Sequence, residues 1–232
     1  MSLDEATALF ADELAGLFSG VFDTPPVFEI FENNVIARPR RIVISIADPG
    51  GAQIRIEGTP IFQLFLSYEC SWNPKTEQRT IVESVFSVLL VGVKEPLWRY
   101  DFNRNMTKVP VAHLNVHAHR DEIAWARALS KRNSHEGVKV SKLHFPFGGV
   151  RFRPTIEDVL QMLIDEFQID CKLGSRGVIE ASRARYFDRQ LEAAVMESPA
   201  IAIKALSRMG YEITRMNAPR PAGIIKSTKT RW

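Results

Sequence analysis

Cysteine is scarce in this chain of 232 residues, which contains only two. Cys70 lies in an apolar segment, Cys171 follows an expected helix, and no CxxC or similarly spaced pair is present. The sequence therefore excludes a disulfide-rich scaffold and a zinc site built on cysteine pairs. We expect two buried free thiols in a reducing compartment, with a disulfide between them as the alternative.

Long apolar runs and the signature motifs of several enzyme classes are also missing. No run reaches the roughly 18 residues that a membrane-spanning helix needs, and the N-terminus carries Asp4 and Glu5 where a signal peptide would be basic. A P-loop, a GxGxxG turn, an HExxH helix, a calcium loop and a GxSxG elbow are all absent. We expect a cytoplasmic protein that makes no membrane contact and uses no cofactor.

The net charge of +3 is distributed unevenly. Residues 1–171 hold 18 Lys and Arg against 22 Asp and Glu, whereas residues 172–232 hold 12 against 5. The basic C-terminal quarter favours an anionic partner, such as nucleic acid or an acidic protein. Alternatively, the positive charge belongs to the solvated face of an amphipathic helix pair and to a flexible tail.

Apolar spacing and turn formers predict an α+β fold with a largely antiparallel, twisted sheet, flanking helices and a small C-terminal helical appendage. The connections between strands are too short for crossover helices, so neighbouring strands should run antiparallel in a sheet of roughly six to eight strands. The expected strands are Val27–Phe31, Arg41–Ala47, Gln53–Glu57, Ile61–Trp72, Arg79–Val91, Leu97–Phe102, Val111–His119 and Lys139–Phe145.

Helical periodicity marks segments before, between and after the expected strands. Thr155, with Asp158 three residues on, has the pattern of a helix cap. For the last two helices, which meet at Ser198–Pro199, we expect an antiparallel hairpin, with a DNA-binding helix-turn-helix as the alternative. The expected helices are Leu3–Phe18, Asp121–Leu129, Thr155–Phe167, Val178–Glu197 and Pro199–Met209.

This pattern predicts three parts. Residues 1–171 should form the α+β domain, residues 178–212 the helical appendage, and residues 213–232 a flexible basic tail. Lys172–Gly177 is the expected linker between the first two parts.

A row of histidines is the strongest functional signal. His113, His117 and His119 fall within seven residues in which polar and apolar side chains alternate, so the period of a strand places them on one face. His144 repeats the pattern in its own short run. Imidazole titrates near neutrality, which suits it to proton transfer.

Such a row can support metal-independent cleavage of RNA. One imidazole takes the proton of the ribose 2′-hydroxyl, another protonates the leaving oxygen, and a basic side chain holds the phosphate. We expect His117 and His144 to be the catalytic pair, assisted by His113 or His119. The expected substrate-binding residues are Arg99, Tyr100, Arg120 and Arg151.

Two other interpretations remain open. In a metal-binding hydrolase, His117 and His119 would share an ion, with His144 or a carboxylate such as Asp101 or Glu122 completing the site. In a non-catalytic module, the histidine face and the basic C-terminal region would bind RNA, another anionic ligand or a protein. In the simplest form of this second interpretation, the histidines face solvent and have no role.

The order Arg99-Tyr100-Asp101, a loop, His113 and then His117-Ala118-His119 resembles the central signature of TumE-type toxins of bacterial toxin–antitoxin pairs. The resemblance covers residues 97–120, and the Asn-x-x-His-His element of that family is not present. It implies a toxin that acts on RNA or another central cell component, with an antitoxin protein as its partner. Our leading prediction is a metal-independent endoribonuclease of toxin type.

Overall fold

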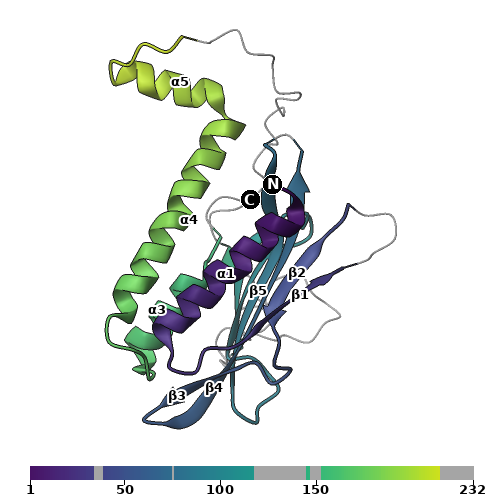
Figure 1. Cartoon of the computed structure of the whole chain (residues 1–232), viewed down its shortest axis with the longest axis vertical. Coiled ribbons are helices and arrows are strands. Elements are labelled where there is room, and N and C mark those ends of the chain that lie inside the picture. The colour runs from purple at the N-terminus through teal and green to yellow at the C-terminus, as the bar shows by residue number, and fades with distance from the viewer. Residues whose placement is uncertain (34–38, 75, 118–144, 147–152, 215–232) are drawn as a thin grey trace, which may run out of the picture.

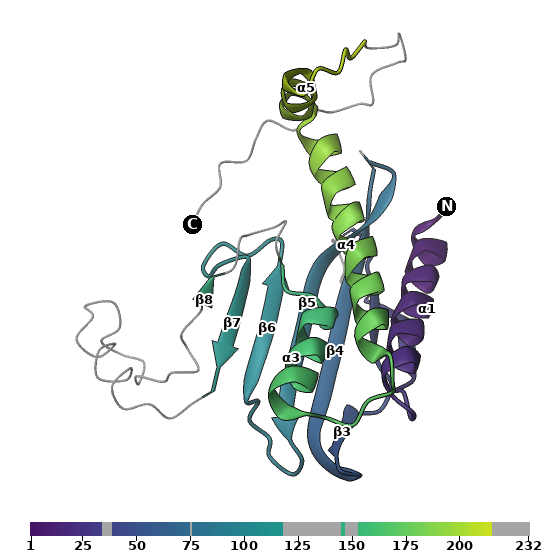
Figure 2. The same cartoon turned by 90° about the vertical axis from the view of Figure 1, so that its left-hand side faces the viewer.

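The computed structural model of the chain describes residues 1–33, 39–74, 76–117, 145–146 and 153–214. Within these residues, eight strands form one antiparallel sheet, and helices lie against one of its faces (Figures 1 and 2). The predicted α+β class is confirmed. The strands are β1 (Phe28–Glu32), β2 (Ile42–Ile46), β3 (Ala52–Ile56), β4 (Thr59–Asn73), β5 (Gln78–Leu90), β6 (Trp98–Asn103), β7 (Ala112–Val116) and β8 (Phe145–Pro146).

The long β4–β5 hairpin is the centre of the sheet, whose order is β1-β2-β4-β5-β6-β7-β8. One edge of β4 is shared, because β3 pairs with its first half and β2 with its second half. The tight turn between β3 and β4 places Glu57 and Gly58 at positive φ, 48° and 76°. Asp170 fixes this turn, since its carboxylate accepts hydrogen bonds from both of these backbone N–H groups, at 2.8 and 2.7 Å.

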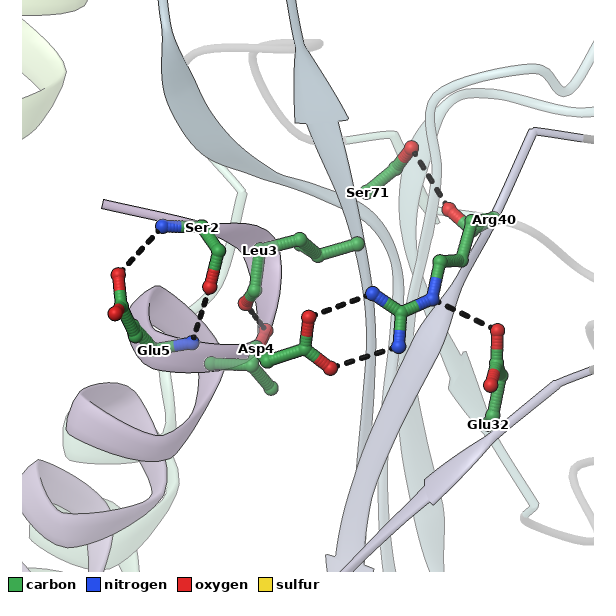
Figure 3. Close-up of polar contacts among 8 residues, drawn as sticks. Ser2, Leu3, Asp4, Glu5, Glu32, Arg40 and Ser71 are labelled. Atoms are coloured by element: carbon green, nitrogen blue, oxygen red, sulfur yellow. Dashed lines mark hydrogen bonds and ion pairs between the residues drawn. The ribbon is translucent and has the colours of Figure 1, made fainter.

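Helix α1 (Leu3–Val21) begins with a capping box in which Ser2 and Glu5 satisfy each other's backbone N–H groups. Its apolar stripe, which includes Leu14, Leu17 and Phe18, is buried in the core. Arg40 ties the first turn of this helix to β1, because its guanidinium donates to Asp4 and to Glu32 (Figure 3). These bonds lower the pKa of the Asp4 carboxyl.

Helix α3 (Ile156–Phe167) has the predicted cap, a capping box between Thr155 and Asp158. Val159, Leu160 and Leu163 are completely buried. Helix α4 (Ser175–Glu197) packs beside α1 and α3, and its Ile179 joins the same core. The start of α4 is thus attached to the sheet domain through apolar packing.

Two expectations about the C-terminal helices are wrong. Ser175–Gly177, expected in a linker, form the first turn of α4, because Gly174 adopts a left-handed conformation (φ 85°) that lets the helix begin there. Helix α5 (Pro199–Arg208) does not fold back along α4 but turns away from its end (Figure 1). Ser198 alone joins the two helices, whereas a helical hairpin needs about two to five connecting residues.

The close approach of α1 to α4 depends on Gly20. A Cβ at this position would lie 2.7 Å from Cγ1 of Val178, whose branched side chain is stiff. We expect Gly20→Ala to lower the free energy of unfolding by about 1–3 kcal/mol, because the helices must separate. Gly16→Ala in the same helix meets no atom within 4 Å and should be neutral or stabilising. Urea unfolding of both variants tests this, and equal effects would contradict the packing argument.

The two thiols differ in exposure. Cys70 is buried and free, as expected, and burial raises its pKa. Cys171 is free but exposed, so the expectation of a second buried thiol is wrong; it follows α3 at the surface beside Asp170. None of the helices in the described ranges combines the length and the hydropathy that a membrane-spanning helix requires. The expected helix Asp121–Leu129, most of the expected strand Lys139–Phe145 and residues 215–232 of the expected tail lie outside the described residues.

Candidate functional site

Asp101 is the centre of a polar cluster that strands β6 and β7 bring together. Asp101 lies opposite His113 and Arg99 lies opposite Asn115 in the antiparallel register, so all four share one face of the sheet. The Asp101 Oδ2 atom accepts hydrogen bonds from Arg99 Nε and Asn115 Nδ2, both at 2.8 Å. The same oxygen is 3.5 Å from His113 Nε2.

His113 is held from both sides of its ring. Its Nδ1 lies 2.8 Å from the carbonyl oxygen of Pro110, which can only accept, so Nδ1 carries a proton. Its Nε2 faces Asp101, and the residue is only 4% exposed. Asn115 is buried as well, at 3%. The interpretation in which the polar face of this strand merely faces solvent is therefore wrong for His113 and Asn115. The arrangement suits an imidazole that is fixed in place and orients its neighbours.

His117 lies at the end of this strand, away from the Asp101 cluster. Its Nδ1 is 3.1 Å from Glu95 Oε1, and its backbone N–H donates to the carbonyl of Leu97. It lies four positions along the extended chain from His113, which corresponds to about 13 Å. The structure therefore does not bring these two histidines together.

The other predicted site residues divide into two groups. Tyr100 is described, but it points to the face of the sheet opposite Arg99, toward the helices. There, burial and the carboxylate of Asp158 raise its pKa. Tyr100 and Arg99 therefore cannot hold one phosphate on the same face. His119, Arg120, His144 and Arg151 lie outside the described residues.

Acidic side chains continue the polar face across β4 and β5. Glu69 lies opposite Glu83 and forms an ion pair with Arg41, while Asn103 donates to Glu83 at 2.7 Å. Burial, reinforced by the charges of Glu69 and Asp101, raises the pKa of Glu83. Within the described ranges, no three His, Cys, Asp or Glu side chains are grouped so that they could hold a metal ion.

A second candidate site, which the sequence did not reveal, lies on the helix face of the sheet. Arg153, two residues before the Thr155 cap of α3, places its guanidinium among three aromatic rings. Its Cζ lies 5.4 Å from the ring centres of Phe102 and Tyr186 and 6.0 Å from that of Tyr68. Its Nη1 is buried and finds no hydrogen-bond acceptor among the residues that the structure describes.

Arg153 lines a pocket of about 40 Å³ between α1, α4 and the start of α3, which we name the arginine pocket. At about 10–15 Å³ for each water, this volume holds a few waters or one small polar group. Its walls are formed by Phe10, Glu13, Leu14, Tyr68, Arg153, Pro154, Thr155, Ile156, Glu157, Ser182, Arg185, Tyr186 and Arg189.

The charges of the arginine pocket are only partly balanced. Arg189 forms an ion pair with Glu13, and Glu157, which is buried, accepts a hydrogen bond of 2.6 Å from Ser182. The guanidinium of Arg153 has no carboxylate partner in the described part of the chain, and Arg185 adds a further cation to the wall. The lining therefore has an excess of positive charge.

A further arginine lies behind this wall. Arg79 sits 4.0 Å from the ring centre of Phe10 and donates to the sulfur of Cys70 at 3.8 Å. Burial lowers the pKa of Arg79, and the charges of Arg153 and Arg189 act in the same direction. Burial likewise raises the pKa of Tyr68, so its phenol stays protonated. The pocket thus offers cations and hydroxyl donors, which suit an oxygen anion.

The sequence contained a weak signal for this pocket. Arg79 begins the expected strand Arg79–Val91, and Arg153 stands immediately before a proline and a helix cap. Neither residue reveals from its position alone that it meets α1 and α4. Comparison of the chain with protein-family models, with curated proteins and with solved structures found no match.

Proposed function

We propose that the protein is a non-catalytic binding module that holds a small oxyanionic group, a phosphate or a carboxylate, in the arginine pocket. The observation that carries this proposal is the buried Nη1 of Arg153, which has no acceptor among the described residues. A buried N–H donor without an acceptor lowers stability, so an anion that supplies this acceptor would bind and stabilise the fold.

The aromatic cage supports this role. The rings of Phe102, Tyr68 and Tyr186 lie at cation–π distance from the guanidinium and favour its charged form there, while the N–H groups at its edge can donate to a ligand in the plane of the group. The small volume favours a single terminal group over a whole nucleotide. A free anion and the terminal phosphate or carboxylate of a larger ligand would make the same contacts in the arginine pocket.

Thermal unfolding with added inorganic phosphate, sulfate or acetate tests the proposal, with chloride at equal ionic strength as the reference. The wild type should gain stability with concentration, by about 2.7 kcal/mol at a hundred times the dissociation constant. Arg153→Met should be at least as stable as the wild type without anion and should show no response to it.

Arg176→Met is the matched control. Arg176 lies on α4, a helix that also lines the arginine pocket, but it pairs with Asp165 outside that pocket. This variant should keep the anion response. A wild type that does not respond, or an Arg153→Met variant that responds equally, would overturn the proposal. A response to phosphate and sulfate without acetate would identify a tetrahedral anion, whereas a response to acetate would identify a carboxylate.

One observation favours the predicted ribonuclease as a second candidate. Strand β8, which directly follows His144 in the sequence, is hydrogen bonded to β7, with Phe145 opposite Leu114. The strand that carries His113, and that ends beside His117, therefore adjoins the segment that follows His144. An acid–base pair of His117 and His144 would need these two segments to be neighbours. A toxin of this kind would act on cytoplasmic RNA and be neutralised by an antitoxin protein.

Incubation with total RNA in EDTA tests this candidate. Cleavage that withstands chelation and disappears in both His117→Ala and His144→Ala would support it. Absence of cleavage by the wild type, or full cleavage by either variant, would rule out this acid–base pair.

A further inference from the structure

The second half of α4 and all of α5, which we name the arm, present apolar side chains to solvent. Phe187, Leu191 and Val195 follow one another at four-residue spacing on α4 and are 57%, 67% and 45% exposed. On α5, Ile201, Ile203 and Leu206 are exposed as well. Two neighbouring helices therefore each carry an apolar face that the described chain leaves uncovered.

Helix α5 needs a surface to pack on. It has ten residues and not one of them is buried. A helix of this length is marginal in water unless an apolar face is packed against another element. Figures 1 and 2 show it standing away from the sheet beyond the end of α4.

The connection between the two helices, which we name the hinge, prevents α5 from packing on the α4 of its own chain. Ser198 is the only residue between the two helices, and Pro199 fixes the first turn of α5. Two helices so connected cannot lie antiparallel side by side, because the chain cannot reverse within one residue. Within the described residues the two faces are therefore uncovered, and α5 cannot cover the α4 of its own chain.

The charges beside these faces are complementary to each other. We name the row of Phe187, Leu191 and Val195 the α4 stripe. Asp188 and Glu192 border this stripe, whereas Lys204 and Arg208 border the apolar face of α5. All four side chains belong to exposed residues. An α5 helix laid against an α4 stripe would therefore match both apolar faces and opposite charges.

We infer that two copies of this chain form a dimer in which α5 of each copy packs on the α4 stripe of the other, an arrangement that we call arm exchange. A twofold arrangement satisfies both faces of both copies with one type of contact. Short hinges that forbid packing within one chain are a common origin of such exchange. This inference is independent of the arginine pocket and of any catalytic role.

Sedimentation equilibrium of the full chain over a range of micromolar concentrations provides the first test. The wild type should be a dimer, and Leu191→Lys should raise the dissociation constant at least about tenfold. Leu173→Lys is the matched control, since Leu173 is fully exposed but lies outside the arm, and it should leave the dimer intact. A wild type that stays monomeric throughout would overturn the inference.

Charge reversal provides the second test. Asp188→Lys with Glu192→Lys makes one chain in which all four of these bordering charges are basic, and Lys204→Glu with Arg208→Glu makes another in which all four are acidic. Each chain alone should dimerise more weakly than the wild type, whereas a mixture of the two should form heterodimers. Equal dimerisation of each chain alone and of the mixture would contradict the exchange of α5 onto α4.

Lengthening the hinge separates exchange from other modes of dimerisation. Four Gly and Ser residues inserted between Ser198 and Pro199 should allow α5 to fold back on its own α4, and the protein should become a monomer of unchanged helix content by circular dichroism. A dimer that survives the insertion would overturn arm exchange. Binding of the wild-type monomer to anionic phospholipid vesicles, without dimerisation, would assign the apolar faces to a lipid surface and would overturn it as well.

Discussion

Phe18→Ala is expected to lower the free energy of unfolding by about 3–5 kcal/mol. Phe18 is fully buried, and its ring meets those of Phe28 and Phe22, with centres 5.3 and 5.9 Å apart. These contacts join α1 to β1 and to the segment that connects them. Because the ring is held between a helix and the sheet, neither side can move in to fill the space that alanine would leave.

Urea unfolding followed by circular dichroism measures this loss, provided that the slope of the transition is unchanged. Leu9→Ala is the matched control, because Leu9 lies on the same helix but is 56% exposed. It should change stability by less than about 1 kcal/mol. Similar losses in the two variants would mean that α1 does not pack through the face that contains Phe18.

The sheet was predictable because its signals are local. Alternating apolar residues marked six strands to within a residue or two, and β7 ends three residues before its expected end at His119. Turn formers such as Asp48-Pro49-Gly50-Gly51 separated the strands. Thr155 and Asp158 predicted a cap that the structure contains. The predicted hairpin of α4 and α5 was wrong although the predicted helix ends were nearly right, because those ends leave only Ser198 between the helices, too few residues to reverse the chain.

The sites were less predictable because they depend on pairing between distant segments. The alternation in Val111–His117 placed His113 and Asn115 on one face, but only the register of β6 and β7 puts Asp101 beside them. The arginine pocket joins residues from β4, α1, the start of α3 and α4. No spacing within one segment encodes such a meeting, since packing of helices on the sheet determines it.

Removal of Asp101 tests whether the histidine strand is held by the polar cluster. We expect Asp101→Ala to lower the free energy of unfolding by about 2–4 kcal/mol. Most of this loss comes from Asn115, which is 3% exposed and whose Oδ1 already has no partner among the described residues. Its Nδ2 would lose its acceptor too, and the whole amide would be buried without a hydrogen bond. Arg99 contributes little, because its side chain is 42% exposed and water can replace the carboxylate.

Two further variants separate these contributions. Asp101→Asn keeps an acceptor oxygen in the same place and removes only the charge, so it should cost less than Asp101→Ala. Arg99→Met should cost less than about 1 kcal/mol, since it removes only a partly exposed ion pair. If Asp101→Ala costs no more than Arg99→Met, water must reach Asn115 in the variant, and the cluster cannot be what fixes His113. If the predicted order holds, the buried Asn115–Asp101 hydrogen bond, and not the exposed ion pair, holds β7 beside β6 with the ring of His113 between Pro110 and Asp101.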